Sequence, residues 1–167
     1  EKHVQDGNIV VGVFISSDMS GTFSTASTAK GMIVKKYPEA KIELIDSRSN
    51  SMELGFVAVA VARAAKNGES LEQVLYQAHN VIAKSRFLFI PESLEHLKKG
   101  GRIGGATALI GSLLQIKPIL TVTNGKTEVF NKVRTKNKAI QCMLEAFYSD
   151  VEQKGLVDAV IQHINNE

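Results

Sequence analysis

The sequence predicts an α/β protein in which a parallel-sheet N-terminal domain precedes a second domain of mixed α+β structure. Short β-branched apolar runs in the first half each lead into a helical pattern, and this order is typical of a parallel sheet covered by helices. In the second half, Asn124-Gly125 stands between two alternating runs, which is the strongest short-range signal for an antiparallel hairpin. Because the composition changes near Ser85, we expect domains at residues 1–84 and 85–167.

The first half is expected to begin with a strand, a helix and a second strand. Residues 8–15 form a short β-branched apolar run, which is typical of a buried strand. Apolar side chains then recur at helical spacing from Phe23 to Tyr37, and Pro38 ends that pattern. Residues 41–46 form the second apolar run, so two parallel strands with a helix between them are expected.

Two further helices are predicted before the second half begins. In the stretch 52–66 valines alternate with alanines as in a strand, but its length and the Asn67-Gly68 stop favour a helix buried on most sides. Ser70 begins another helix, because Gln73 completes a capping-box pattern and apolar residues recur as far as Ile82.

The second half is expected to mix strands with helices. Its predicted order is a strand over 86–91, a short helix over 92–99, a glycine-rich loop over 100–105, an apolar helix over 106–114, hairpin strands over 119–123 and 126–133, a helix over 135–152 and a last strand over 157–164.

Length and composition limit the class of protein. The 167 residues suffice for one ordinary domain or two small ones, and 44% apolar with 22% charged residues is the balance of a globular protein. No apolar run approaches the roughly 20 residues of a membrane span, so stable membrane insertion is not expected. The net charge of +3 is small and no aromatic residues interleave with the basic clusters, so nucleic acid is not an expected partner. A modest positive excess suits a local anionic ligand or an acidic partner.

Cysteine and histidine usage argue against disulfides and metals. Cys142 lies in an apolar helical pattern, which predicts a buried thiol. A single cysteine forms no internal disulfide, which fits a reducing compartment and a cytoplasmic location. The four histidines are far apart in the sequence, so we expect no metal site.

A serine-rich turn, residues 16–22, directly follows the first strand and precedes the first long helix. Hydroxyls and backbone N–H groups at a helix N-terminus accept a phosphate or a carboxylate. Ser20, Gly21 and Thr22 are therefore candidate ligand-binding residues, although Ser and Thr also cap helices that bind nothing. Asp46, at the carboxyl end of the second strand, is expected at the same edge of the sheet, where ligands of such sheets bind.

A second candidate is the loop 98–105, in which four glycines surround Arg102. Such a loop can be a helix C-cap and linker. We favour a functional role, in which the backbone approaches a ligand closely and Arg102 supplies a positive fork for an oxyanion. The apolar stripe that follows adjoins this basic loop, and this arrangement suits an apolar ligand with an anionic head.

Catalytic motifs are incomplete. Gly125-Lys126-Thr127 resembles the end of a P-loop, but Leu120 stands where the pattern requires glycine. Met19-Ser20-Gly21 lies on a strand–turn–helix like a nucleophile elbow, but Asp18 replaces the first glycine. We therefore assign no catalytic residue and treat Ser20 as a hydrogen-bond donor.

Five ordered blocks together resemble the DegV family, the bacterial fatty-acid-binding proteins also called FakB. These blocks are residues 15–23 (ISSDMSGTF), 45–47 (IDS), 97–103 (LKKGGRI), 114–120 (LQIKPIL) and 132–135 (KVRT).

The resemblance implies two α/β domains that bind one long-chain fatty acid between them, with no other cofactor. The family member presents the acid to an ATP-dependent fatty acid kinase, which forms an acyl phosphate for phospholipid metabolism. Ser20 matches the serine and Arg102 the arginine of the family's motifs, so Ser20 with the N–H groups of Gly21 and Thr22 would hold the carboxylate. Candidates for head-group or partner charge are Lys117 and Arg134, and candidates for the tail pocket are Leu109, Ile110, Leu113 and Leu114.

The resemblance also has gaps. The family's earlier T-S-Q-P segment, whose Thr holds the carboxylate, and its late G-T-H-x-G-P-G segment do not occur in the sequence, and His163 matches a different position. We therefore expect an internal fragment of a family member with an incomplete site. Exposed sheet edges and apolar surface should then make the isolated chain bind fatty acid poorly and associate.

Two other functions stay open. One is an enzyme acting on a small phosphorylated or carboxylated substrate, with the serine turn and the glycine-rich loop as an anion clamp. The other is a protein-interaction module without a small ligand.

Overall fold

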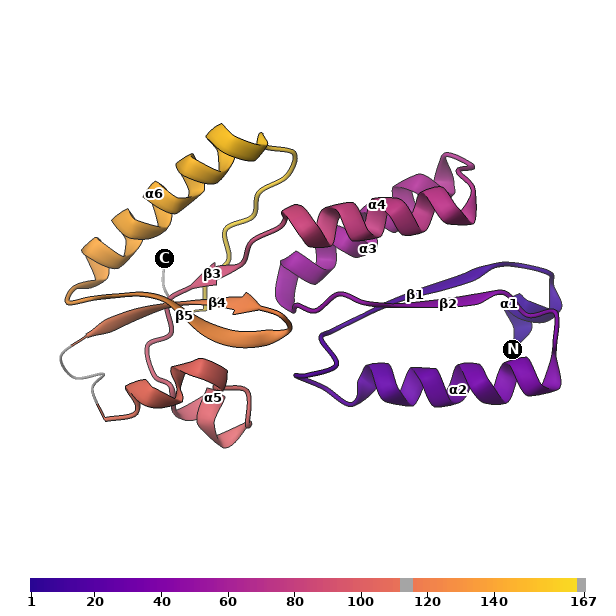
Figure 1. Cartoon of the computed structure of the whole chain (residues 1–167), viewed down its shortest axis with the longest axis horizontal. Coiled ribbons are helices and arrows are strands. Elements are labelled where there is room, and N and C mark those ends of the chain that lie inside the picture. Colours follow the sequence, from indigo (N-terminus) through magenta and orange to yellow (C-terminus); the bar gives the residue numbers. More distant parts are fainter. Residues whose placement is uncertain (112–115, 165–167) are drawn as a thin grey trace.

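The structure is a computed structural model that describes residues 1–111 and 116–164. Figure 1 shows a parallel β-sheet with its helices in the first half and an antiparallel β-sheet with its helices in the second. The elements in order are α1 (Lys2–Gln5), β1 (Val10–Phe14), α2 (Thr22–Lys36), β2 (Ile42–Asp46), α3 (Ser51–Lys66), α4 (Leu71–Lys84), β3 (Leu88–Phe89), α5 (Glu95–Lys99), the 3-10 helix η1 (Gly104–Leu109), β4 (Lys117–Thr123), β5 (Lys126–Val133) and α6 (Lys136–Lys154). The predicted fold class is confirmed.

In the first half, β1 and β2 pair in parallel from Val10 opposite Ile42 to Phe14 opposite Asp46. Helices α3 and α4 cover one face of this sheet and α2 lies on the other (Figure 1). The predicted capping box starts α4, because Ser70 Oγ accepts the N–H of Gln73 while the Gln73 side chain accepts the N–H of Ser70. The buried core joins β2 to α3 and α4 and consists of Ile45, Val57, Val61, Ala64, Val74 and Ala78.

In the second half, the strands lie in the order β3-β4-β5 and pair antiparallel. Helix α6 lies on one side of this sheet, and α5 with η1 lies on the other (Figure 1). The β4–β5 hairpin turn, which points toward the first half, is the predicted Asn124-Gly125 turn. A second core lies under the hairpin and consists of Leu94, Ile103, Ala106, Leu109 and Leu120.

The predicted helix over 106–114 is wrong in type and in bounds. A 3-10 helix forms over Gly104–Leu109 instead, and residues 112–114 lie outside the described part of the chain. Gly104 and Gly105 belong to this helix because it packs closely on the hairpin. A Cβ on Gly104 would lie 2.1 Å from the carbonyl oxygen of Thr127, so side chains do not fit there.

Other predicted elements differ from the structure at the edges of the fold. The strand over 86–91 shortens to Leu88–Phe89, the helix over 92–99 begins only at Glu95, and the N-terminal helix α1 was not predicted. Residues 157–164 form no strand and are exposed, and they pair with neither of the two sheets. The thiol of Cys142 is only half-buried, since α6 is a surface helix, and it accepts a hydrogen bond from Asn131 at 3.1 Å.

Candidate functional site

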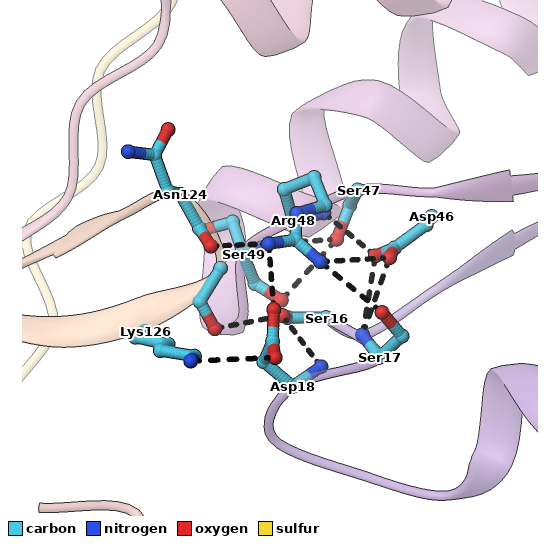
Figure 2. Close-up of polar contacts among 10 residues, drawn as sticks. Ser16, Ser17, Asp18, Asp46, Ser47, Arg48, Ser49, Asn124 and Lys126 are labelled. Atoms are coloured by element: carbon cyan, nitrogen blue, oxygen red, sulfur yellow. Dashed lines mark hydrogen bonds and ion pairs between the residues drawn. The ribbon is translucent and has the colours of Figure 1, made fainter. Parts of the chain in front are cut away.

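The turn after β1 and the loop after β2 meet at the carboxyl edge of the parallel sheet, as the sequence predicts (Figure 2). Asp46 Oδ1 accepts the backbone N–H groups of Ser17 at 3.3 Å and of Arg48 at 2.9 Å. The N–H of Ser16 donates to the carbonyl oxygen of Ser49 at 2.8 Å. These bonds fix the serine turn on the end of β2.

Arg48 extends this network to a second carboxylate. Its Nη2 lies 2.6 Å from Asp18 Oδ2, and its Nη1 lies 3.4 Å from Asp46 Oδ2 and donates to Ser17 Oγ at 3.2 Å. The backbone of Arg48 is left-handed, with φ of 54°, which is uncommon for a residue with a side chain. Through its contacts with Asp18, Ser17 and Asp46, the guanidinium group of Arg48 bridges the two turns that follow β1 and β2.

The hairpin turn of the second half touches the same network (Figure 2). Ser16, which is fully buried, donates from Oγ to the carbonyl oxygen of Gly125 at 2.7 Å. Arg48 Nη2 donates to the carbonyl oxygen of Asn124, and Lys126 Nζ lies 3.8 Å from Asp18 Oδ1. The serine turn therefore lies between the two halves of the chain.

Two carboxyl groups of this region have opposite pKa shifts. Burial acts to raise the pKa of Asp46, but hydrogen bonds from Ser17 and Arg48 outweigh it and lower that pKa. Burial raises the pKa of Glu53, although a hydrogen bond from the Ser49 hydroxyl opposes this shift in part. The lowered pKa favours the charged form of Asp46, which the hydrogen bonds of the network stabilise.

Ser20 and Thr22 open the helix α2. Their hydroxyl oxygens lie 2.5 Å apart, and the N–H of Thr22 donates to Ser20 Oγ at 3.3 Å. Only one hydroxyl hydrogen lies between these two oxygens, so the other can be donated to a ligand. Gly21 and Thr22 are exposed and Ser20 is half-buried, so an anion can reach the turn.

Arg102 is brought to this turn from the second half. Its Nε donates to the carbonyl oxygen of Met19 at 3.0 Å, and its Nη1 donates to the carbonyl oxygen of Gly100. The structure therefore places the two predicted motifs, the serine turn and the glycine-rich loop, side by side. Among the described residues, the hydrogen bonds of Arg102 go to carbonyl oxygens, and it forms no ion pair with a carboxylate.

The remaining predicted residues do not gather at the turn. Lys117 begins β4 and Arg134 follows β5, so both lie at the far end of the hairpin, roughly 20 Å from its Asn124-Gly125 turn at the usual rise of a strand. Leu109 is 3% exposed and belongs to the second core, whereas Ile110 is 43% exposed. Leu113 and Leu114 lie outside the described residues.

An apolar cavity of about 220 Å³ lies between α2 and the parallel sheet, and its lining includes neither Ser20 nor Arg102.

Within the described residues, no cluster of three or more His, Cys, Asp and Glu side chains could hold a metal ion. In the same part of the chain, every helix is too short or too polar to cross a membrane.

Sequence reasoning missed Arg48 and the contacts of the hairpin turn. The only available signal for Arg48 was its place after Asp46, at the edge where the serine turn was expected. The Asn124-Gly125 pair predicts a hairpin by its residue types, and nothing in those types indicates that it would contact Ser16.

The fold and this geometry define an α/β protein in which the serine turn after the parallel strand β1 contacts both the hairpin turn and the glycine-rich loop of the second half. The chain belongs to the DegV family, because the family model described as "Uncharacterised protein, DegV family" matches residues 1–167. The resemblance carried by the sequence blocks is confirmed.

Similar proteins extend beyond the matched region. A DegV domain-containing protein of Clostridium acetobutylicum is 54% identical over 165 residues, which are 99% of this chain and 58% of that protein. A solved fatty-acid-binding DegV family protein from Thermus thermophilus is 31% identical, with a TM-score of 0.81 over 90% of this chain and 52% of that one. A solved stearic-acid-binding protein from Eubacterium ventriosum is 28% identical, with a TM-score of 0.81 over 91% of this chain and 52% of that one. The chain thus spans little more than half of the length of these relatives.

Proposed function

We propose that this chain holds the carboxylate of a long-chain fatty acid at the turn formed by Ser20, Gly21 and Thr22. The observation that carries the proposal is the position of Arg102, which the Met19 carbonyl holds against this turn without an ion-pair partner among the described residues. The fatty acids bound by the Thermus thermophilus and Eubacterium ventriosum proteins support the same ligand.

The geometry explains why an anion, rather than a cation, suits this position. Asp18 and Asp46 are already balanced by Arg48 and Lys126, so their charges are compensated. Arg102 therefore adds a positive charge beside the free hydroxyl hydrogen of the Ser20–Thr22 pair. A carboxylate bound there gains charge-assisted hydrogen bonds, which are the strong class.

The acyl tail should supply most of the affinity. Burying each CH₂ group contributes ~0.8 kcal/mol, so the polar turn sets the orientation of the acid. We propose that Leu109 and Ile110, with Leu113 and Leu114, adjoin the tail, and that residues 1–84 and 85–167 act as two domains around it.

We further propose that the protein is a cytoplasmic carrier, and not itself an enzyme, that presents the acid to an ATP-dependent fatty acid kinase for phospholipid metabolism. Arg102 is exposed, so a partner can reach an acid held beside it. Lys117 and Arg134, at the far end of the hairpin, are better placed for a partner surface than for the carboxylate.

Lipid extraction tests this function. We define the completed protein as a chimera in which these 167 residues replace the matching residues of the Clostridium acetobutylicum relative. Purified completed protein, extracted and analysed by mass spectrometry, should yield a long-chain acid at about one per chain. A small phosphorylated or carboxylated metabolite in its place would support the alternative, an enzyme with an anion clamp. If nothing is extracted and added palmitate does not bind, an interaction module becomes the better account.

A further inference from the structure

We propose that Arg48 is a positioning residue of the carboxylate site, which tunes the affinity for an acid without touching it. This inference rests on the proposed function, because it concerns the same turn. Arg48 holds the serine turn in place and also balances the negative charge beside it.

Arg48 is itself held firmly enough to act in this way. Its backbone N–H donates to Asp46 Oδ1 at 2.9 Å, which maintains the left-handed backbone at φ of 54°. Its guanidinium then reaches Asp46, Ser17 and Asp18 together. A planar fork that contacts several acceptors at once fixes geometry in a way that an ammonium group does not.

The held groups are close to Ser20 along the chain. The N–H groups of Met19 and Ser20 donate to the carbonyl oxygen of Ser16 at 2.9 and 3.0 Å, so residues 16–20 form one closed turn. Asp18 lies inside this turn and forms the 2.6 Å ion pair with Arg48. A shift of Asp18 therefore moves the Ser20 hydroxyl.

Arg48 also joins the turn to the second half. Its Nη2 donates to the carbonyl oxygen of Asn124, beside the bond from Ser16 to Gly125. Arg102 contacts the same turn from the second half through Met19. The spacing between the Ser20 hydroxyl and the Arg102 guanidinium thus depends on contacts that Arg48 completes.

The charge balance gives Arg48 a second effect on an incoming acid. The charged groups that face it are Asp18 and Asp46, and the cation that shares Asp18 is Lys126. Without Arg48, Asp18 would keep Lys126 but Asp46 would lose its ion pair, so a net negative charge would lie beside the turn. Such a charge repels a carboxylate over roughly 10 Å at moderate salt but not a neutral ligand.

The test compares a charged and a neutral ligand in the completed protein. Dissociation constants for palmitic acid and 1-hexadecanol are measured by calorimetry or by displacement of a fluorescent acid. Arg48→Ala should weaken palmitate binding about tenfold or more, as expected for the loss of charge-assisted contacts. Binding of 1-hexadecanol should weaken clearly less, because the alcohol loses at most a neutral hydrogen bond and is not repelled by the carboxylates. Arg48→Lys, which keeps the charge but not the fork, should recover part of the palmitate affinity.

Arg63→Ala is the matched control. Arg63 lies on α3, away from the site, and pairs with Asp158 at 3.3 Å, so its removal changes the net charge equally. It should leave both dissociation constants unchanged. In the Arg48→Ala background, Asp18→Asn removes one of the two carboxylates, so Lys126 offsets the charge that remains, and part of the palmitate affinity should return.

The outcomes separate this inference from the proposed function. Equal losses for acid and alcohol, or no loss for the acid, would overturn the role of Arg48 while leaving fatty-acid binding intact. Absence of palmitate binding by the unsubstituted completed protein would refute the proposed function and this inference with it. If circular dichroism shows that Arg48→Ala does not fold, Arg48→Gln, which keeps part of the stem and two donors, carries the same comparison.

Discussion

Replacing Gly125 by alanine tests the contact between the hairpin turn and the serine turn. Gly125 has φ of +82°, and a Cβ there would lie 2.6 Å from Ser16 Oγ and 2.7 Å from Arg48 Cζ. Ser16 and Arg48 would have to move to make room for the methyl group. Their hydrogen bonds to the Gly125 and Asn124 carbonyls would then break.

The structure gives a magnitude for this change. A left-handed backbone costs alanine about 1–2 kcal/mol, and each lost hydrogen bond costs about 1 kcal/mol. Gly125→Ala should therefore lower the free energy of unfolding by about 3–4 kcal/mol. Gly68 is the matched control, since its φ is +76° and no heavy atom lies within 4 Å of the place that a Cβ would take there. Gly68→Ala should show the backbone cost alone, about 1–2 kcal/mol.

Urea denaturation of the completed protein, followed by circular dichroism, measures both variants. The informative quantity is the difference between their free energies of unfolding, because the backbone cost is common to both variants and cancels. Equal destabilisation by Gly125→Ala and Gly68→Ala would refute the reasoning that the hairpin turn presses on Ser16 and Arg48.

Four further predictions follow from the site. Ser20→Ala should weaken fatty-acid binding by about 1–2 kcal/mol with an unchanged circular dichroism spectrum, and unaltered affinity by calorimetry would remove Ser20 from the site. Arg102→Ala should reduce kinase-dependent acyl phosphate formation more than acid binding, because phosphorylation adds negative charge that the Arg102 cation would offset. Equal losses in the two assays would argue against a role of Arg102 in offsetting that charge. Because the pKa of Asp46 is lowered in the folded state, its stabilisation is present above the ordinary carboxyl pKa and is lost as pH falls through the lowered value. Asp46→Asn should therefore lower the free energy of unfolding at neutral pH and change it little in strong acid. A loss of unfolding free energy that is equal at all pH values would contradict the lowered pKa of Asp46. The isolated 167-residue chain should associate in light scattering and bind palmitate more weakly than the completed protein, and a monomer of equal affinity would show that the added segments are not needed.

Local patterns predicted most of the fold. The Ser70–Gln73 capping box and the Asn124-Gly125 turn depend on neighbouring residues, and both form as expected. The strand expected over 157–164 does not form, because an apolar pattern shows only that a segment suits a sheet, and whether it pairs with one depends on tertiary contacts. Likewise, Gly104 and Gly105 were expected in a loop. The close contact with β5 that accompanies their 3-10 helix is tertiary, so local sequence could not reveal it.

In the candidate site, too, the features set by local residue types were predicted, and those set by tertiary contacts were missed. The serine turn and the glycine-rich loop were found by residue type, and the structure brings them together through the bond from Arg102 to Met19. Arg48 was missed because its importance arises from partners 30 and more positions distant, including Ser17 and Asn124. Lys117 and Arg134 were singled out by their charge as candidates for the head group or for a partner surface, and charge alone says nothing of the length of the hairpin between them and the turn.

The central claim is that Ser20 and Arg102 hold the carboxylate of a bound fatty acid. Carbon-13 NMR of palmitate labelled at its carboxyl carbon tests it most directly, in the completed protein and in its Ser20→Ala and Arg102→Ala variants. We predict one bound carboxyl signal that stays ionised to a lower pH than the free acid, because a nearby cation favours the charged form. Each variant should move this signal and raise its titration midpoint. A bound signal that neither variant changes would contradict the claim.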